Sequence, residues 1–204
     1  MSSKILRVTW LSILLGIGME LILLIAAAGF GTLHGLKPII ADLVQKVSWS
    51  FVVCVGLALG TASTRMRASS MGLAGMIAAP AAFNVAHALH KSALQALEIA
   101  GPAAAGVPAP LVLALVKAVE YGWLGLVLGW VGKRASGAKT YALIGFGTGL
   151  VCAGVIIALV VQGAAKAPSV AALVSRAINE VLFPIGCSLV LFAAETVGRT
   201  KQSQ

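Results

Sequence analysis

The chain has 204 residues, of which 59% are hydrophobic and 10% are charged, and its mean hydropathy is +1.00. This composition leaves no room for a sizeable soluble domain and predicts an integral membrane protein. The net charge of +9 does not indicate a nucleic-acid partner, because the basic residues form one small cluster per loop without interleaved aromatic side chains.

Long apolar runs predict helices that cross a membrane. A spanning helix needs about 20 mainly apolar residues, so the chain has room for about six. Barrel strands would alternate apolar and polar residues, whereas runs such as 150–161 are continuously apolar. We therefore expect an all-α integral membrane protein with a single transmembrane domain over residues 1–204.

Six helices are predicted in chain order, over residues 9–30, 38–64, 70–89, 110–132, 140–161 and 168–197. Lys4 and Arg7 precede the first helix as they would precede a signal peptide, but its length and Glu20 favour an uncleaved span. Small residues near its end keep cleavage open as an alternative. Pro80 predicts a kink in the third helix, and the Ala/Gly/Pro-rich segment 92–109 predicts a short amphipathic piece followed by a loop.

A pattern at the start of the second, fourth and sixth helices predicts an internal repeat. A proline is followed by four residues, then by Leu-Val, and one or two positions later by a basic residue. The three copies begin at Pro38, Pro110 and Pro168, and their basic residues are Lys46, Lys117 and Arg176. The pattern favours three pseudo-symmetric two-helix units, 1–67, 68–139 and 140–204, with a duplication of the outer two alone as the alternative. Such tandem units resemble the general architecture of mitochondrial carriers, but the acidic and basic signature of those carriers after the proline is missing, so no property is carried over.

Basic residues predict which side of the membrane each end faces. Nine of the fifteen lie at the N-terminus, at the ends of the even helices or at the C-terminus: Lys4, Arg7, Arg65, Arg67, Lys133, Arg134, Lys139, Arg199 and Lys201. With six helices these positions share one side, which the positive-inside rule makes cytoplasmic. We therefore expect both termini in the cytoplasm, in a membrane of the bacterial inner type. Contact of these residues with anionic lipids is a further expectation, and a topology signal alone is the simpler explanation.

Five ionisable residues are predicted to form a polar centre within the membrane: Glu20, Lys117, Glu120, Arg176 and Glu180. Glu20 lies 13 residues after Arg7, and Glu120 lies 13 residues before Lys133, so both carboxyls are ~20 Å from the basic clusters. An ionisable residue at that depth is costly and usually faces a bundle interior or a water-filled cavity. This favours a role in transport, with a buried structural network as the alternative.

Acids and bases in the predicted helices can also pair at helical spacing. The spacing pairs Asp42 with Lys46, Lys117 with Glu120, and Arg176 with Glu180. Glu20 has no basic residue within one turn, so its partner is expected on another helix, with Lys117 and Arg176 as candidates, unless the carboxyl is protonated.

Histidines and glycines complete the set of candidate features. His34, His87 and His90 all fall toward the outer side, where they suggest a three-histidine metal site or an axial ligand for a haem; no HExxH motif accompanies them. The pairs Gly16-x-Gly18 and Gly147-x-Gly149 predict close helix packing.

The four tryptophans, at positions 10, 49, 123 and 130, are expected to form an interfacial belt.

Three functions are compatible with these residues. A small transporter or channel with a proton-linked polar centre is favoured, because internal repeats and buried ionisable groups are common in transporters. A non-catalytic subunit, or an assembly or anchor protein, of a larger membrane complex is the second. The expected protein partners are a membrane complex or further copies of this chain. A metal- or haem-dependent membrane enzyme is the third. No nucleophile elbow, P-loop or dinucleotide fingerprint is present, so we expect neither an enzyme nor a cofactor.

Overall fold

The computed structural model describes residues 2–33, 35–63, 65–99, 109–134, 136–164 and 167–200. These residues form six α-helices: α1 (Ser2–Gly29), α2 (Leu36–Gly60), α3 (Arg67–Ala96), α4 (Pro110–Val131), α5 (Ala138–Gly163) and α6 (Val170–Thr200). All six are long and apolar enough to cross a membrane, which indicates a multi-pass integral membrane protein. The predicted all-α class and the number of helices are thereby confirmed.

The third helix is longer than predicted. It continues through Pro80 and ends at Ala96, so the amphipathic piece expected after residue 92 is the last turn of α3 rather than a separate element. Within α3 the Asn84 side chain donates a hydrogen bond to the Pro80 carbonyl oxygen at 3.0 Å. A second internal proline, Pro184, lies in α6, and there the Ser188 hydroxyl donates to the Pro184 carbonyl oxygen at 2.7 Å.

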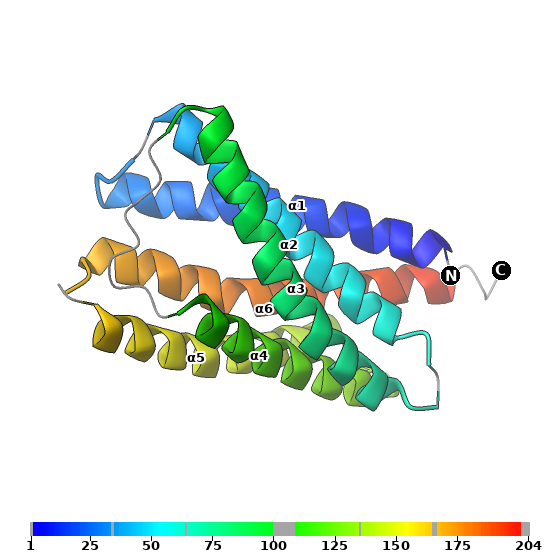
Figure 1. Ribbon diagram of the computed structural model, residues 1–204. Coiled ribbons are helices and arrows are strands. Elements are labelled where there is room, and N and C mark those ends of the chain that lie inside the picture. Colours follow the sequence, from blue (N-terminus) through cyan, green and yellow to red (C-terminus); the bar gives the residue numbers. More distant parts are fainter. Residues whose placement is uncertain are drawn as a thin grey trace.

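The start of α1 and the end of α6 lie at the same end of the bundle (Figure 1). This end, which we call the basic end, also holds the α2–α3 connection, with Arg65, and the start of α3, with Arg67. The opposite end, called the far end, holds the connections α1–α2 and α5–α6. The basic clusters of the described residues therefore gather at one end, as the positive-inside pattern requires.

The helices form a closed ring in which each helix packs against its neighbours in sequence and α1 closes against α6. The even helices α2, α4 and α6 also contact one another in the middle of the bundle. Within the described ranges, α1, α3 and α5 do not contact each other. This inner and outer arrangement matches what three two-helix units would give, while the duplication itself remains a prediction from the sequence.

Glycine allows close approach at several of these helix pairs. A Cβ on Gly16 of α1 would lie 2.6 Å from the Val47 Cα of α2, and one on Gly145 of α5 would lie 2.6 Å from the Ile185 Cα of α6. Gly18 and Gly147 have nothing within 4 Å of such a Cβ. The predicted packing role is therefore right for Gly16 and for Gly149, which approaches Val181, but wrong for Gly18 and Gly147 within this chain.

An apolar core fills the bundle toward the basic end. Its largest fully buried members from the even helices are Leu57, Tyr121, Leu124, Leu128 and Leu191. In the same layer the buried thiols of Cys54 on α2 and Cys187 on α6 are in contact, with their Sγ atoms 3.3 Å apart. This core separates the polar residues in the middle of the bundle from the basic end.

Candidate functional site

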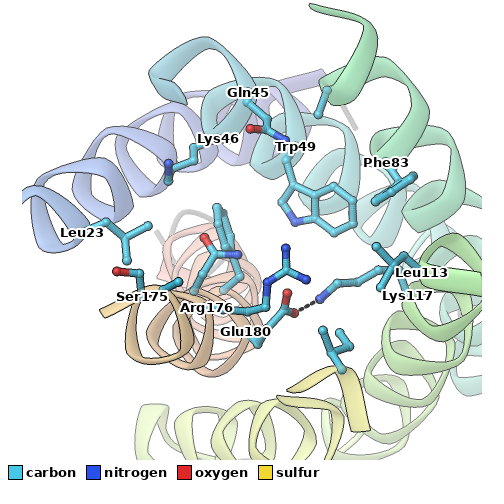
Figure 2. A pocket seen from close by; sticks show the side chains of 15 residues that line it. Leu23, Gln45, Lys46, Trp49, Phe83, Leu113, Lys117, Ser175, Arg176 and Glu180 are labelled. Carbon is cyan, nitrogen blue, oxygen red and sulfur yellow. Dashed lines mark hydrogen bonds and ion pairs between the residues drawn. The ribbon is translucent and has the colours of Figure 1, made fainter. Parts of the chain in front are cut away.

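A cavity of about 380 Å³ lies among the even helices, at the level of the predicted polar centre. Its charged lining residues are Lys46 of α2, Lys117 of α4, and Arg176 and Glu180 of α6. These three basic residues are the ones that follow the repeated proline pattern, and Figure 2 shows that they come from different helices and extend into one space. The structure thus brings together three cations that lie 71 and 59 residues apart in sequence (117 − 46 and 176 − 117).

A second cavity, of about 440 Å³, continues from the first toward the far end. The two cavities share Leu23, Lys46, Ala172 and Ser175. The second is also lined by Thr32 and Ser169, which lie in the connections α1–α2 and α5–α6. The polar centre is therefore connected by cavities to the far end of the bundle.

Lys117 is the most heavily contacted charge of the site. Its ammonium donates to Glu120 at 2.7 Å and also forms an ion pair with Glu180 across the α4–α6 contact. The same nitrogen lies 5.7 Å from the ring centroids of both Trp49 and Tyr121. Lys117, Glu120 and Glu180 are all at least 92% buried, so the three charges are held away from water.

Glu20 finds its partner on another helix, as predicted, but neither candidate was right. The Lys46 ammonium lies 2.6 Å from Glu20 Oε2, and the Glu20 side chain is only 6% exposed. Lys46 therefore does not pair with Asp42 as the spacing on its own helix suggested. Asp42 instead contacts His90 of α3, with Oδ1 3.1 Å from Nε2. The pair within α2 does not form because Glu20 of α1 lies opposite Lys46 and His90 of α3 lies opposite Asp42.

Arg176 is the exception among the cations of the site. The predicted partner, Glu180, is taken by Lys117, and no described carboxylate lies within 4.0 Å of the Arg176 guanidinium. Figure 2 shows the Arg176 side chain extending from α6 toward the middle of the cavity, on the side of the Trp49 ring. The guanidinium is half-buried and lines the cavity.

The histidines do not gather into a metal site in the part of the chain that the structure describes. His90 contacts Asp42, and the His87 ring stacks on Phe83 with centroids 6.2 Å apart. His34 lies outside the described residues. No group of three or more His, Cys, Asp or Glu side chains in metal-binding proximity occurs among the described residues.

Several neutral residues of the cavity were not predicted from the sequence. Gln45 and Trp49 lie on the Lys46 face of α2, and Ser175 and Asn179 lie on the Arg176 face of α6. Trp49 was expected at the interface, but it lines the cavity, whereas Trp10, Trp123 and Trp130 are more than half exposed on the outside of the bundle. A spacing of three residues from each base would have found Trp49 and Asn179, whereas Gln45 and Ser175 directly precede Lys46 and Arg176.

A second ionic cluster closes the basic end. Glu195 of α6 accepts hydrogen bonds from Lys4 of α1 at 3.4 Å, from Arg67 of α3, and from the Tyr141 hydroxyl of α5 at 3.2 Å. Lys4 also donates to the Thr61 hydroxyl at the end of α2, at 2.8 Å. One carboxylate thus links all three outer helices, which do not pack against each other in the described part of the chain. We call these five residues the Glu195 cluster.

Comparisons of the chain with known protein families, curated proteins and solved structures found no match.

Proposed function

We propose that this protein is a small membrane transporter whose substrate site is the cavity between the even helices. The observation that carries the proposal is the convergence of Lys46, Lys117 and Arg176 on one cavity that continues to the far end, with carboxylates paired to the two lysines. Ionisable groups at this depth usually serve a substrate or proton path, because burying them has a cost that packing alone does not repay.

The closed basic end supports alternation between two conformations. The core and the Glu195 cluster lie between the cavity and the basic end, while the cavities reach the far end. A transporter must expose its site to one side at a time, and internal repeats with a site at their interface suit that movement. The described conformation is then the state open to the far end, and opening of the basic end requires the Glu195 cluster to separate.

Orientation follows from the distribution of charge. By the positive-inside rule, the Lys and Arg clusters at the basic end support a cytoplasmic location of both termini, and we propose that the far end faces outward across a bacterial-type inner membrane. The same clusters would contact anionic lipid headgroups in the cytoplasmic leaflet.

Side-specific cysteine labelling tests the proposal without knowledge of the substrate. Ser175→Cys, which lines both cavities, is introduced after Cys54, Cys152 and Cys187 are replaced by alanine. The protein is treated with a membrane-impermeant maleimide from each side in turn. Alternation predicts labelling from both sides, whereas labelling from the far side alone would contradict transport by alternating access.

Two exposed positions serve as controls for sidedness. Lys139→Cys at the basic end should react only from the cytoplasmic side, and Leu33→Cys at the far end should react only from outside. The reverse pattern would show that the predicted orientation is wrong.

A non-catalytic subunit of a membrane complex remains the second candidate function. It is favoured by the outer face of α5, where Gly147 and Gly154 are exposed and have nothing within 4 Å of a built Cβ, as an interface with another helix requires. Purification from the native membrane in nanodiscs, with the intact mass as the readout, tests this function. A stoichiometric partner lost in Gly147→Leu would support it, and a homogeneous assembly of this chain alone would argue for the transporter.

A further inference from the structure

We propose that the cavity binds a small organic monocarboxylate at Arg176 and that a proton is taken up by the Glu120 and Glu180 carboxyl pair when this anion binds. The inference rests on the proposed function and deepens it, because it names the substrate class and the coupling ion. The anion is identified by three properties of the cavity: its unmatched cation, its walls and its volume.

The Arg176 guanidinium indicates that the ligand carries a carboxylate. Lys46 is paired with Glu20, and Lys117 is paired with two carboxylates, whereas the Arg176 guanidinium has no carboxylate within 4.0 Å among the described residues. A guanidinium offers a planar fork of donors that matches a carboxylate with two parallel hydrogen bonds. Neutral donors and acceptors that could orient the same group, Ser175 and Asn179, lie on the same face of α6.

The lining and the volume of the cavity indicate that the bound anion is an organic molecule. Beside the charged groups the lining is aromatic or aliphatic: Trp49, Phe83 and Phe183, with Leu23, Leu113 and Ile156. A volume of about 380 Å³ is at the lower end of the range for small-molecule sites, which are mostly apolar with a few placed polar groups. A hydrated inorganic ion would leave these apolar walls unused.

The balance of charge supplies the coupling to a proton. Around the site, Lys46, Lys117 and Arg176 face Glu20, Glu120 and Glu180, so the six ionised groups sum to zero. Bound carboxylate adds one negative charge in a region where an uncompensated charge is costly. Glu120 and Glu180 share a single ammonium, and Glu120 Oε1 is buried without a hydrogen-bond partner in the described structure. A proton bonded to one carboxyl oxygen of this pair restores neutrality, and it leaves with the anion on the other side.

Three further titratable groups lie near the pair. They are Tyr121 on α4, Cys187 on α6 and Cys152 on α5, and a phenol or thiol group carries no charge. Asp42, which lines the second cavity nearer the far end, contacts His90. None of these five groups lines the first cavity.

Binding of three aromatic probes to the full-length protein in nanodiscs tests the anion. Benzoate and benzamide have the same planar shape and differ in charge, benzylamine is a cation of similar size, and their affinities are measured by titration calorimetry. We expect benzoate to bind at least tenfold more tightly than benzamide and benzylamine not to bind. Arg176→Gln should lower the affinity for benzoate at least tenfold, and Arg176→Lys should lower it less. The Arg134 guanidinium lies over the Trp130 ring on the outside of the bundle, so Arg134→Gln should leave the affinity for benzoate unchanged.

Several outcomes would overturn the inference. These are equal binding of benzoate and benzamide, unchanged affinity in Arg176→Gln, absence of binding by acetate, butyrate and benzoate at millimolar concentration, and displacement of benzoate by equal concentrations of chloride or phosphate. If Arg176→Gln does not fold, the contrast between benzoate and benzamide in the unaltered protein still decides the question.

Proton uptake is measured in the same complex. Benzoate added to weakly buffered protein with a pH indicator should remove close to one proton per site, and Glu120→Gln/Glu180→Gln should abolish this uptake. Binding without proton uptake would overturn the coupling. Failure of these tests is distinct from failure of the proposed function, because Ser175→Cys labelling from both sides would still support transport of another substrate.

Discussion

Glu195 of α6 accepts a hydrogen bond from Arg67 of α3, and this pair joins two helices that do not otherwise pack against each other in the described part of the chain. The carboxylate also accepts hydrogen bonds from Lys4 and from the Tyr141 hydroxyl. Its loss would therefore remove the link between α6 and the outer helices α1, α3 and α5 at the basic end. We expect Glu195→Gln to raise the rate at which Ser175→Cys is labelled from the basic end, while its labelling from the far end is unchanged. The measurement is maleimide reactivity from each side of the membrane.

A matched control separates this effect from a general change of charge at the basic end. Lys139→Gln removes an exposed charge at the same end without touching the Glu195 cluster, and it should leave both labelling rates unchanged. If Glu195→Gln also left them unchanged, the Glu195 cluster would not be what keeps the basic end closed.

Two pairs of neighbouring glycines should respond oppositely to alanine. Gly16→Ala and Gly145→Ala place a methyl group against the backbone of the next helix, and we expect each to destabilise the protein by ~1–3 kcal/mol. Gly18→Ala and Gly147→Ala meet open space and remove helix-interior glycines, so each should be neutral or stabilising by up to ~1 kcal/mol. Thermal unfolding in one detergent measures all four. Equal effects within a pair would show that the described helix contacts are wrong.

Removal of Lys117 should reveal how strongly the buried carboxylates depend on it. Lys117→Met leaves Glu120 and Glu180 without their ammonium, and we expect a loss of about 3–5 kcal/mol of stability. A triple variant that also carries Glu120→Gln and Glu180→Gln should regain most of this stability, because no buried charge then lacks a partner. Thermal unfolding of both variants gives the comparison. A single variant as stable as the unaltered protein would contradict the burial argument.

Neutralising single carboxyls should separate folding from transport. Glu20→Gln and Glu120→Gln keep the size of the side chain, so we expect both proteins to purify as folded monodisperse species. We expect them to lose benzoate-dependent acidification of vesicles loaded with a pH dye. Retained acidification in both variants would count against a transport role for the polar centre. Arg134→Gln, on the outer surface, serves as the control that keeps activity.

The sequence was sufficient for the class and number of the helices, but not for the pairing of the charged residues, and it left Lys46, which lines both cavities, outside the predicted polar centre. Composition and length determine six spans, and the repeated proline pattern pointed to Lys46, Lys117 and Arg176, which share a cavity. The partners of these residues depend on which helices are neighbours and how each is rotated. Spacing along one helix therefore gave the Lys117–Glu120 pair correctly and the Asp42–Lys46 and Arg176–Glu180 pairs wrongly.

Residues whose role arises only between helices were missed for the same reason. Glu195 looked like an isolated acid in a basic segment, and nothing in its sequence neighbours indicates Lys4, Arg67 and Tyr141. Trp49 was expected in an interfacial belt because tryptophan is common there, but α2 lies against α4 so that the Trp49 ring faces Lys117. Contacts between distant segments decide both cases, and a single sequence carries no direct record of them.

The contact between Cys54 and Cys187 has a consequence for how the protein could be controlled. The two thiols lie between the cavity and the Glu195 cluster, on two inner helices that would have to separate if the basic end opened. An oxidant that formed a disulfide between them would join α2 to α6 and, in the proposed transport cycle, keep the basic end closed, and a reductant would reverse this. Purified protein should therefore be kept reduced whenever opening of the basic end is to be observed.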